Sequence, residues 1–239
     1  MRSLSFLAAV ALAGCSNTSD AATSAGAGTT RTFAITDFSG VSLRGSDDVD
    51  VRVGTGFSVR AEGPSAELDK LEILRDGDTL KVGRKKNLAG MSWGGGRRGV
   101  KVFVTMPRIV TAQIVGSGNL AIDRVDGQRF GGEAAGSGNL SIATLTVPDA
   151  RLTVAGSGNI DARGRVERLT VKLAGSGNVS AGGVKAGSAT VSLAGSGDVR
   201  ADVVGQAQVS LVGSGDVDLG PQARCSVSKT GSGNVRCGG

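Results

Sequence analysis

Histidine and tyrosine are absent from this chain of 239 residues, and it contains a single tryptophan. Histidine is the commonest general base and the commonest metal ligand in proteins. Its absence excludes Ser-His-Asp and Cys-His catalysis, and it excludes zinc sites built on histidine. Aromatic residues form only 3% of the chain, which argues against a globular core packed around large rings. We therefore expect no enzyme, no cofactor and no metal site.

Cysteine is also scarce, with Cys15, Cys225 and Cys237 as the only examples. Cys225 and Cys237 lie close together in sequence, and in an oxidising compartment two such thiols tend to pair. We expect a disulfide that cross-links the last turn of the chain. The alternatives are free thiols or part of a metal site, although a four-ligand zinc signature is missing.

The first fifteen residues have the anatomy of a secretory signal. Met1-Arg2 precedes a short apolar run from Leu4 to Leu12, and small residues follow. The run is too short to span a bilayer as a helix. The string Leu-Ala-Gly-Cys that ends at Cys15 resembles a bacterial lipobox, which implies a lipidated Cys15 and the membrane as a partner. An ordinary signal peptide with an incidental cysteine is the alternative.

Residues 16–30 are rich in Ser, Thr, Ala and Gly. Such a segment cannot bury enough apolar surface to fold, so we predict a flexible tether between membrane and folded body. Lipoproteins retained at the inner membrane commonly carry Asp after the lipidated cysteine. Ser16 occupies that position here, so the resemblance points to the outer membrane of the cell envelope.

Glycine is abundant, with 40 residues, and much of it lies in a repeat. The string Gly-Ser-Gly begins at residues 116, 136, 156, 175, 195, 213 and 231, at spacings of 18 to 20 residues. An Asn or Asp follows each copy, and Leu, Ile or Val follows that. Repeats of this period indicate a stacked architecture. The Asn and Asp positions are Asn119, Asn139, Asn159, Asn178, Asp198, Asp216 and Asn234.

Apolar and polar residues alternate on both sides of each Gly-Ser-Gly, as in half-buried strands. A meander of hairpins would need no identity between turns, whereas a parallel β-helix stacks equivalent corners about 4.8 Å apart. The identical corners favour an all-β parallel β-helix with an Asn/Asp ladder along one edge. In that ladder the like charges of Asp198 and Asp216 would need compensation by hydrogen bonds, a cation or Arg200.

Residues 107–239 are the predicted regular repeats, and residues 31–106 are predicted to form irregular coils of the same kind. Between the strands of this irregular region lies a basic, glycine-rich loop. Clustered cations attract phosphate and acidic sugars, and an exposed Trp stacks on sugars or sits at a membrane interface. We predict contact with acidic glycan, lipopolysaccharide or an envelope protein; a solvated loop is the alternative, and nucleic acid is not expected despite a pI near 9.6. The residues concerned are Arg84, Lys85, Lys86, Trp93, Arg97 and Arg98.

Three enzymatic or metal-binding interpretations are weaker. Phosphate-binding glycine loops occur once and open a helix, whereas Gly-Ser-Gly recurs between strands. Calcium nonapeptide repeats are rich in Asp, but five of the seven corner residues are Asn. Asp47, Asp48 and Asp50 could serve a polysaccharide-cleaving enzyme only if two carboxyls faced each other across a cleft.

Three features of the sequence are the segment from Val41 to Val53, the strand at Val100–Val104 followed by Pro107, and the Gly-Ser-Gly series. Together they resemble the bacterial head GIN domain family over about residues 33–237. The resemblance implies a right-handed parallel β-helix exported to the envelope and a role in adhesion. We therefore expect a non-catalytic envelope lipoprotein for adhesion, surface interaction or envelope architecture. The alternatives are a β-helical protein that binds or cleaves acidic polysaccharide, and an assembly factor for a periplasmic partner.

Overall fold

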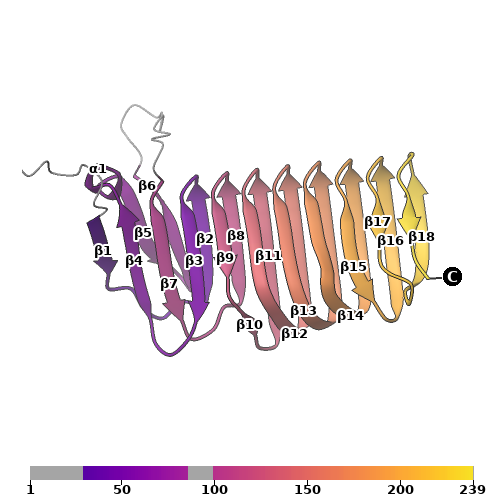
Figure 1. Ribbon diagram of the computed structural model, residues 1–239, viewed down its shortest axis with the longest axis horizontal. Coiled ribbons are helices and arrows are strands. Elements are labelled where there is room, and N and C mark those ends of the chain that lie inside the picture. Colours follow the sequence, from indigo (N-terminus) through magenta and orange to yellow (C-terminus); the bar gives the residue numbers. More distant parts are fainter. Residues whose placement is uncertain (1–28, 86–98, 239) are drawn as a thin grey trace, which may run out of the picture.

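The structure is a stack of β-coils that runs along the molecule (Figure 1). Alternating apolar side chains of the strands are buried in its interior. The computed structural model describes residues 29–85 and 99–238. Within these ranges the coils stack in parallel through about 6 turns, with equivalent residues about 20 positions apart. The predicted parallel β-helix is confirmed. No helix of the described ranges is long and apolar enough to cross a membrane.

The repeat array, which we define as residues 111–238, places one strand before and one after each Gly-Ser-Gly corner. In its middle, the strand after one corner continues around the opposite bend into the strand before the next corner. The strands are β8 (Thr111–Gly116), β9 (Asn119–Ile122), β10 (Val125–Asp126), β11 (Arg129–Gly136), β12 (Asn139–Gly156), β13 (Asn159–Gly175), β14 (Asn178–Gly195), β15 (Val199–Val203), β16 (Gln206–Gly213), β17 (Val217–Asp218), β18 (Arg224–Thr230) and β19 (Val235–Arg236).

The strands that lead into the corners keep one register from coil to coil, so each inward position there forms a column of apolar side chains. At the opposite bend the register shifts, for example between Ile142 and Leu145. Ile114 pairs with Ala134, and further along the same column Leu173 pairs with Leu193. These residues are at most 2% exposed. Burial of one side chain per coil in each column repeats the same favourable hydrophobic contribution along the axis. The fold is thus stabilised by many equivalent contacts between neighbouring coils.

The two glycines of each corner are required by close contact between coils. Gly136 has φ of +117°, and a Cβ there would lie 2.4 Å from the Gly116 carbonyl oxygen. A Cβ at Gly138 would lie 2.2 Å from the Gly118 carbonyl oxygen. The N–H groups of Ser137 and Gly138 both donate to the Gly116 carbonyl at 2.9 Å. The intervening serine has no such restriction and is exposed in every copy.

The first coil consists of β2 (Gly40–Gly45) and β3 (Asp48–Val53), and it lies between two segments that follow it in sequence. β2 pairs in parallel with β8 on one side, and β3 pairs with β9. On its other side the first coil is covered by the N-terminal cap, which consists of β1 (Thr29–Phe33), β4 (Ser58–Gly63), α1 (Ser65–Leu68), β5 (Leu71–Asp76), β6 (Thr79–Arg84) and β7 (Lys101–Met106).

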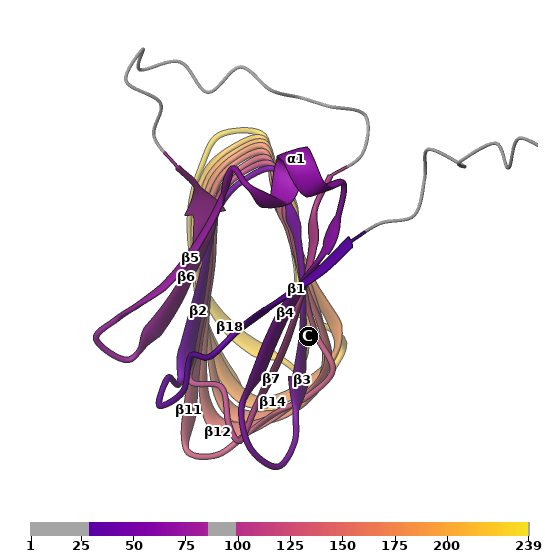
Figure 2. The same ribbon diagram turned by 90° about the vertical axis from the view of Figure 1, so that its left-hand side faces the viewer.

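Only part of segment 31–106 follows the coil geometry expected from the sequence. β6 and β7 stack in parallel on the first coil, but β1, β4 and β5 pair antiparallel with their neighbours. The view along the axis shows the β5–β6 hairpin extending away from the coils and α1 near one corner (Figure 2). β1 begins at Thr29, within the predicted tether, whereas Cys15 and residues 16–28 lie outside the described ranges.

In the last coil a lysine and a disulfide-bonded cysteine occupy positions that hold apolar side chains in the preceding coil. Lys229 occupies the inward column of Leu211, and its ammonium group donates to the Gly233 carbonyl at 2.9 Å. Cys225 continues the column of Ala207 and forms a disulfide with Cys237, with 6.2 Å between the Cα atoms. An inward charge at a terminal coil disfavours the addition of another strand to the open sheet.

Candidate functional site

The Asn and Asp residues of the repeat lie in one column. Asn139 Nδ2 donates to Asn119 Oδ1 at 2.9 Å, and Asn159 Nδ2 donates to Asn139 Oδ1 at 2.8 Å. Asn178 donates to Asn159 Oδ1 through both its backbone N–H and its side chain. These bonds tie successive coils together, which makes the ladder a structural device for fixing the register.

Asp48 forms an additional first rung of the ladder, beyond the seven positions predicted from the sequence. Its Oδ1 accepts from the Asn119 backbone N–H at 3.1 Å and from Asn119 Nδ2 at 2.9 Å. The signal was present in the sequence, because Gly45-Ser46-Asp47-Asp48 has the corner pattern with Asp47 in place of the second glycine.

Hydrogen bonds compensate the adjacent carboxylates of Asp198 and Asp216. Asp198 Oδ1 accepts from the Asp216 backbone N–H at 3.0 Å, and Asp216 Oδ1 accepts twice from Asn234, at 2.8 and 3.1 Å. The bonds from Asn234 are the main cause of a lowered pKa at Asp216, with smaller help from the nearby charges of Arg236 and Arg200. Arg200 is not within ion-pair distance of either carboxylate.

Arg84 has a different role from the polyanion contact predicted for it. Its Nε donates to Asp47 Oδ2 at 2.6 Å, its Nη2 pairs with Asp47 Oδ1, and its Nη1 donates to Glu67 Oε2 at 2.6 Å. Asp47 is 1% exposed and also accepts from the Val100 backbone N–H. These hydrogen bonds, that of Asp47 first, raise the pKa of Arg84. Arg84 therefore joins the cap to the first coil and is not available to a ligand.

Among the other residues predicted to contact polyanions, Lys85 is exposed, and its ammonium group donates to the Asp69 carbonyl at 2.8 Å. Lys86, Trp93, Arg97 and Arg98 lie outside the described ranges. The third acid singled out beside Asp47 and Asp48 is Asp50, which pairs with Lys101 at 2.9 Å. In residues 29–85 and 99–238 no three or more Cys, Asp or Glu side chains group as metal ligands would.

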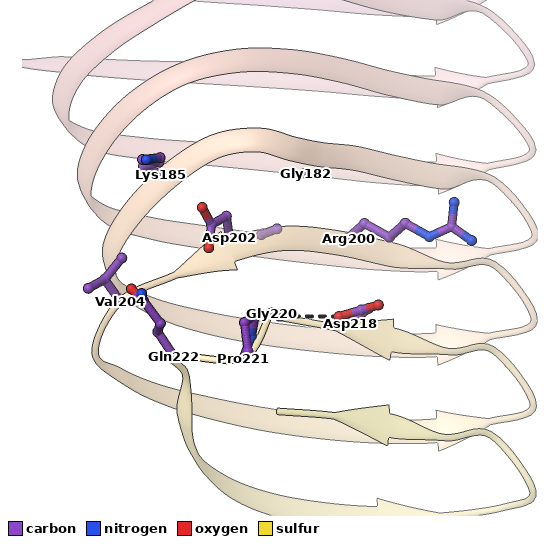
Figure 3. Close-up of a pocket in the computed structure, with 10 residues that line it drawn as sticks. Gly182, Lys185, Arg200, Asp202, Val204, Asp218, Gly220, Pro221 and Gln222 are labelled. Carbon is purple, nitrogen blue, oxygen red and sulfur yellow. Dashed lines mark hydrogen bonds between the residues drawn. The ribbon is translucent and has the colours of Figure 1, made fainter. Parts of the chain in front are cut away.

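A step groove of about 480 Å³ forms where the coils shorten. The spacing of corners falls from 20 to 18 residues after Gly195, and the register between β14 and β15 shifts between Ala181 and Lys185. Lys185, Arg200 and two aspartates line the step (Figure 3), and the Asp218 carboxylate accepts from the Gly220 N–H at 3.1 Å. Equal numbers of cations and anions give this groove no preference for either charge.

A second groove, of about 520 Å³, crosses the first residues of β8 and β11 and the residues of β12 and β13 that are in register with them. We call it the arginine groove. Its volume is in the usual range of small-ligand sites. The side chains that line it include three arginines and one aspartate. The lining residues are Val110, Thr111, Gln128, Arg129, Phe130, Gly131, Asp149, Ala150, Arg151, Arg168 and Thr170.

Stacked parallel coils, a polar ladder and exposed outward columns define a β-solenoid. The chain belongs to the family described as "Putative auto-transporter adhesin, head GIN domain", whose sequence profile matches residues 37–223. No functionally curated protein matches the sequence.

Solved structures of low sequence identity share the fold. A "putative adhesin" from Bacteroides fragilis superposes with a TM-score of 0.79 at 20% identity and covers 88% of this chain and 96% of its own. A "putative lipid binding protein" from Parabacteroides distasonis gives a TM-score of 0.70 at 23% identity, with coverage of 89% and 97%. A "putative adhesin" from Parabacteroides merdae gives 0.62 at 17% identity, with coverage of 89% and 97%. At these identities the likeness establishes the fold alone.

Proposed function

We propose that this protein is a non-catalytic, lipid-anchored module of the bacterial envelope that uses its solenoid for adhesion or surface interaction. The observation that carries the proposal is the rigid array of outward columns, each presenting one side chain per coil. Solenoids of this kind offer long surfaces whose side chains are held in a regular spacing. Membership of a family described as adhesins supports the same function.

The positions of three carboxylates support a non-catalytic role. Asp47 pairs with Arg84, Asp48 accepts from Asn119, and Asp50 pairs with Lys101. Each acid that a polysaccharide-cleaving enzyme could have used at this turn thus has a structural partner. A hydrolase needs two carboxyls that face each other across a substrate cleft.

The anchor proposal rests on the lipobox-like string that ends at Cys15. In a Gram-negative host, we expect the full chain to incorporate labelled palmitate and to fractionate with outer membranes. Cys15→Ser should abolish the label and release the protein. Labelling that persists in Cys15→Ser would exclude lipidation at this cysteine.

Adhesion is tested in the bacterium that encodes the chain. Deletion of the gene should reduce attachment of cells to glycan-coated surfaces, and complementation should restore it. A complementing variant with Lys85, Lys86, Arg97 and Arg98 changed to Ser tests the basic loop, and Trp93→Ala tests the aromatic contact. Arg84 stays unchanged because its loss would disturb the cap. Attachment that is unaltered by deletion would overturn the adhesion role.

A further inference from the structure

The arginine groove gathers cations from three successive coils. Arg129 on β11 pairs in register with Asp149 on β12, which pairs with Arg168 on β13. Since neighbouring strands lie about 4.8 Å apart, Arg129 and Arg168 originate roughly 10 Å from each other. Arg151 lies two residues beyond Asp149 on the same strand and next to Gly131 of β11. The four charged side chains therefore surround one short stretch of the sheet.

The single carboxylate of the groove neutralises only one of these arginines. Arg168 donates to Asp149 through Nε at 2.5 Å and through Nη2 at 2.7 Å. This contact with Arg168 is the main reason that the pKa of Asp149 is lowered, and the charge of Arg129 lowers it further. Among the described residues, Arg129 and Arg151 have no ion pair within 4.0 Å. Two guanidinium groups thus remain available to an anion from solvent.

Gly131 gives the groove its depth. Its position is outward-facing between Thr111 and Arg151, and a Cβ there would meet only Thr111 Cγ2, at 3.9 Å. A side chain at this position would therefore fit the fold and fill the groove. The neighbouring Phe130 is 2% exposed, so it forms part of the buried floor and not a hydrophobic anchor.

We propose that the arginine groove is a binding site for the carboxylate or sulfate groups of an acidic oligosaccharide. Guanidinium groups bind such oxyanions through two parallel hydrogen bonds. Thr111, Thr170 and Gln128 add polar groups that can bond to sugar hydroxyls. This proposal names a ligand class for the surface-interaction function above, on which it rests.

The surroundings of the groove favour a soluble glycan over a bilayer. Proteins that bind membrane surfaces insert apolar side chains beside their cations. The exposed large apolar residues of the described ranges are Leu74, Val115, Val204, Val212 and Val227. None of them lines the groove.

Titration calorimetry of the purified full chain tests the site. The probes are size-defined oligosaccharides of heparin and of polygalacturonate, with an equally long maltodextrin as the neutral probe. Arg151→Gln should weaken binding of an acidic oligosaccharide by about tenfold or more, because one charge-assisted contact is lost. Gly131→Ile should remove binding by filling the groove without any change in charge.

Matched controls separate the groove from general effects. Arg200→Gln removes one exposed positive charge elsewhere and should leave binding unchanged. Gly182→Ile adds the same side chain on β14, where a Cβ meets nothing within 4 Å, and should bind as wild type. Thermal unfolding of every variant establishes that each is folded.

Three results would overturn the proposal. These are no binding of any acidic oligosaccharide by wild type, equal weakening by Arg200→Gln and Arg151→Gln, or undiminished binding by a folded Gly131→Ile. Inorganic phosphate and vesicles of phosphatidylcholine with phosphatidylglycerol are further probes. Vesicle binding that is abolished by Gly131→Ile, without oligosaccharide binding, would replace the glycan by a lipid headgroup. If the calorimetry overturns the groove but deletion of the gene still reduces cell attachment, the site is refuted and the adhesion role is retained.

Discussion

The repeat array and the N-terminal cap bury the same kinds of apolar residue, but they join their strands in different ways. In the array each coil contacts its neighbours through the same corner glycines, the same ladder and the same inward columns. The cap uses antiparallel strands, a short helix and the partly buried cluster of Asp47, Arg84 and Glu67. Stability in the array is therefore distributed over many equal contacts, whereas attachment of the cap depends on a few individual side chains.

The largest expected effect comes from a corner glycine inside the array. Gly156→Ala would force a Cβ to within 2.4 Å of the Gly136 carbonyl oxygen at φ of +125°. We expect a loss of more than about 3 kcal/mol in the free energy of unfolding, measured by denaturant titration. Gly45→Ala is the matched variant in the first coil, where φ is +121° but a Cβ meets nothing within 4 Å. It should lose only about 1–2 kcal/mol, from backbone strain. Equal losses would show that contact between coils does not determine the corner glycines.

The next effect tests the attachment of the cap. Asp47→Ala leaves the partly buried Arg84 without its main partner, so we expect a loss of about 3–5 kcal/mol. Asp149→Ala removes a carboxylate from an exposed pair and should change stability little. Hydrogen exchange should show that the Asp47 variant first loses protection in β4 to β7. Uniform loss along the array would contradict this localisation.

A smaller loss of stability is expected for substitutions in the Asn/Asp ladder, and it should be larger in the middle of the ladder than at its end. Asn159→Ala removes one bond donated to Asn139 and two bonds accepted from Asn178, so we expect a loss of about 1–2 kcal/mol. Asn234→Ala removes only the bond that its side chain donates to Asp216, keeps the bond from its backbone N–H, and should be less harmful. Chemical unfolding of both variants checks the order, and the reverse order would show that the ladder does not fix the register.

The smallest expected effect is a pH dependence that originates in the cap. Hydrogen bonds from Lys70 and then Arg84 lower the pKa of Glu67. A carboxylate with a lowered pKa in the folded state stabilises the fold above its unfolded pKa of about 4.3. That contribution disappears as the pH falls through the folded pKa. Thermal midpoints measured from pH 6 down to pH 3 should therefore fall less steeply in Glu67→Gln than in wild type. Identical slopes would contradict a linked role for Glu67.

Sequence periodicity predicted the array well because every coil obeys the same local rule. The spacing of Gly-Ser-Gly and the alternation around it were sufficient to predict the coils, the corners and the column of Asn119 to Asn234. The cap was less predictable. No local pattern in the sequence predicts that β2 lies between β6 and β8 and β3 between β7 and β9, because that arrangement depends on pairing between distant segments.

The candidate binding sites also differ in how far the sequence predicted them. Composition drew attention to the basic segment from Arg84 to Arg98, yet Arg84 pairs with Asp47 and Glu67 inside the fold. Arg129, Arg151 and Arg168 had no distinguishing sequence pattern. They come together only because the register of three coils places them around Gly131.

The sequence by itself determined the coil length, the corner chemistry and the identity of the ladder, since these follow from local backbone preferences repeated at a fixed period. The tertiary structure alone decided where the first coil lies, which charges are neutralised and where a groove opens. The physical reason is that contacts between coils join residues 18 to 20 positions apart or more. Such contacts depend on register and on side-chain geometry in three dimensions, and a local pattern does not encode either one.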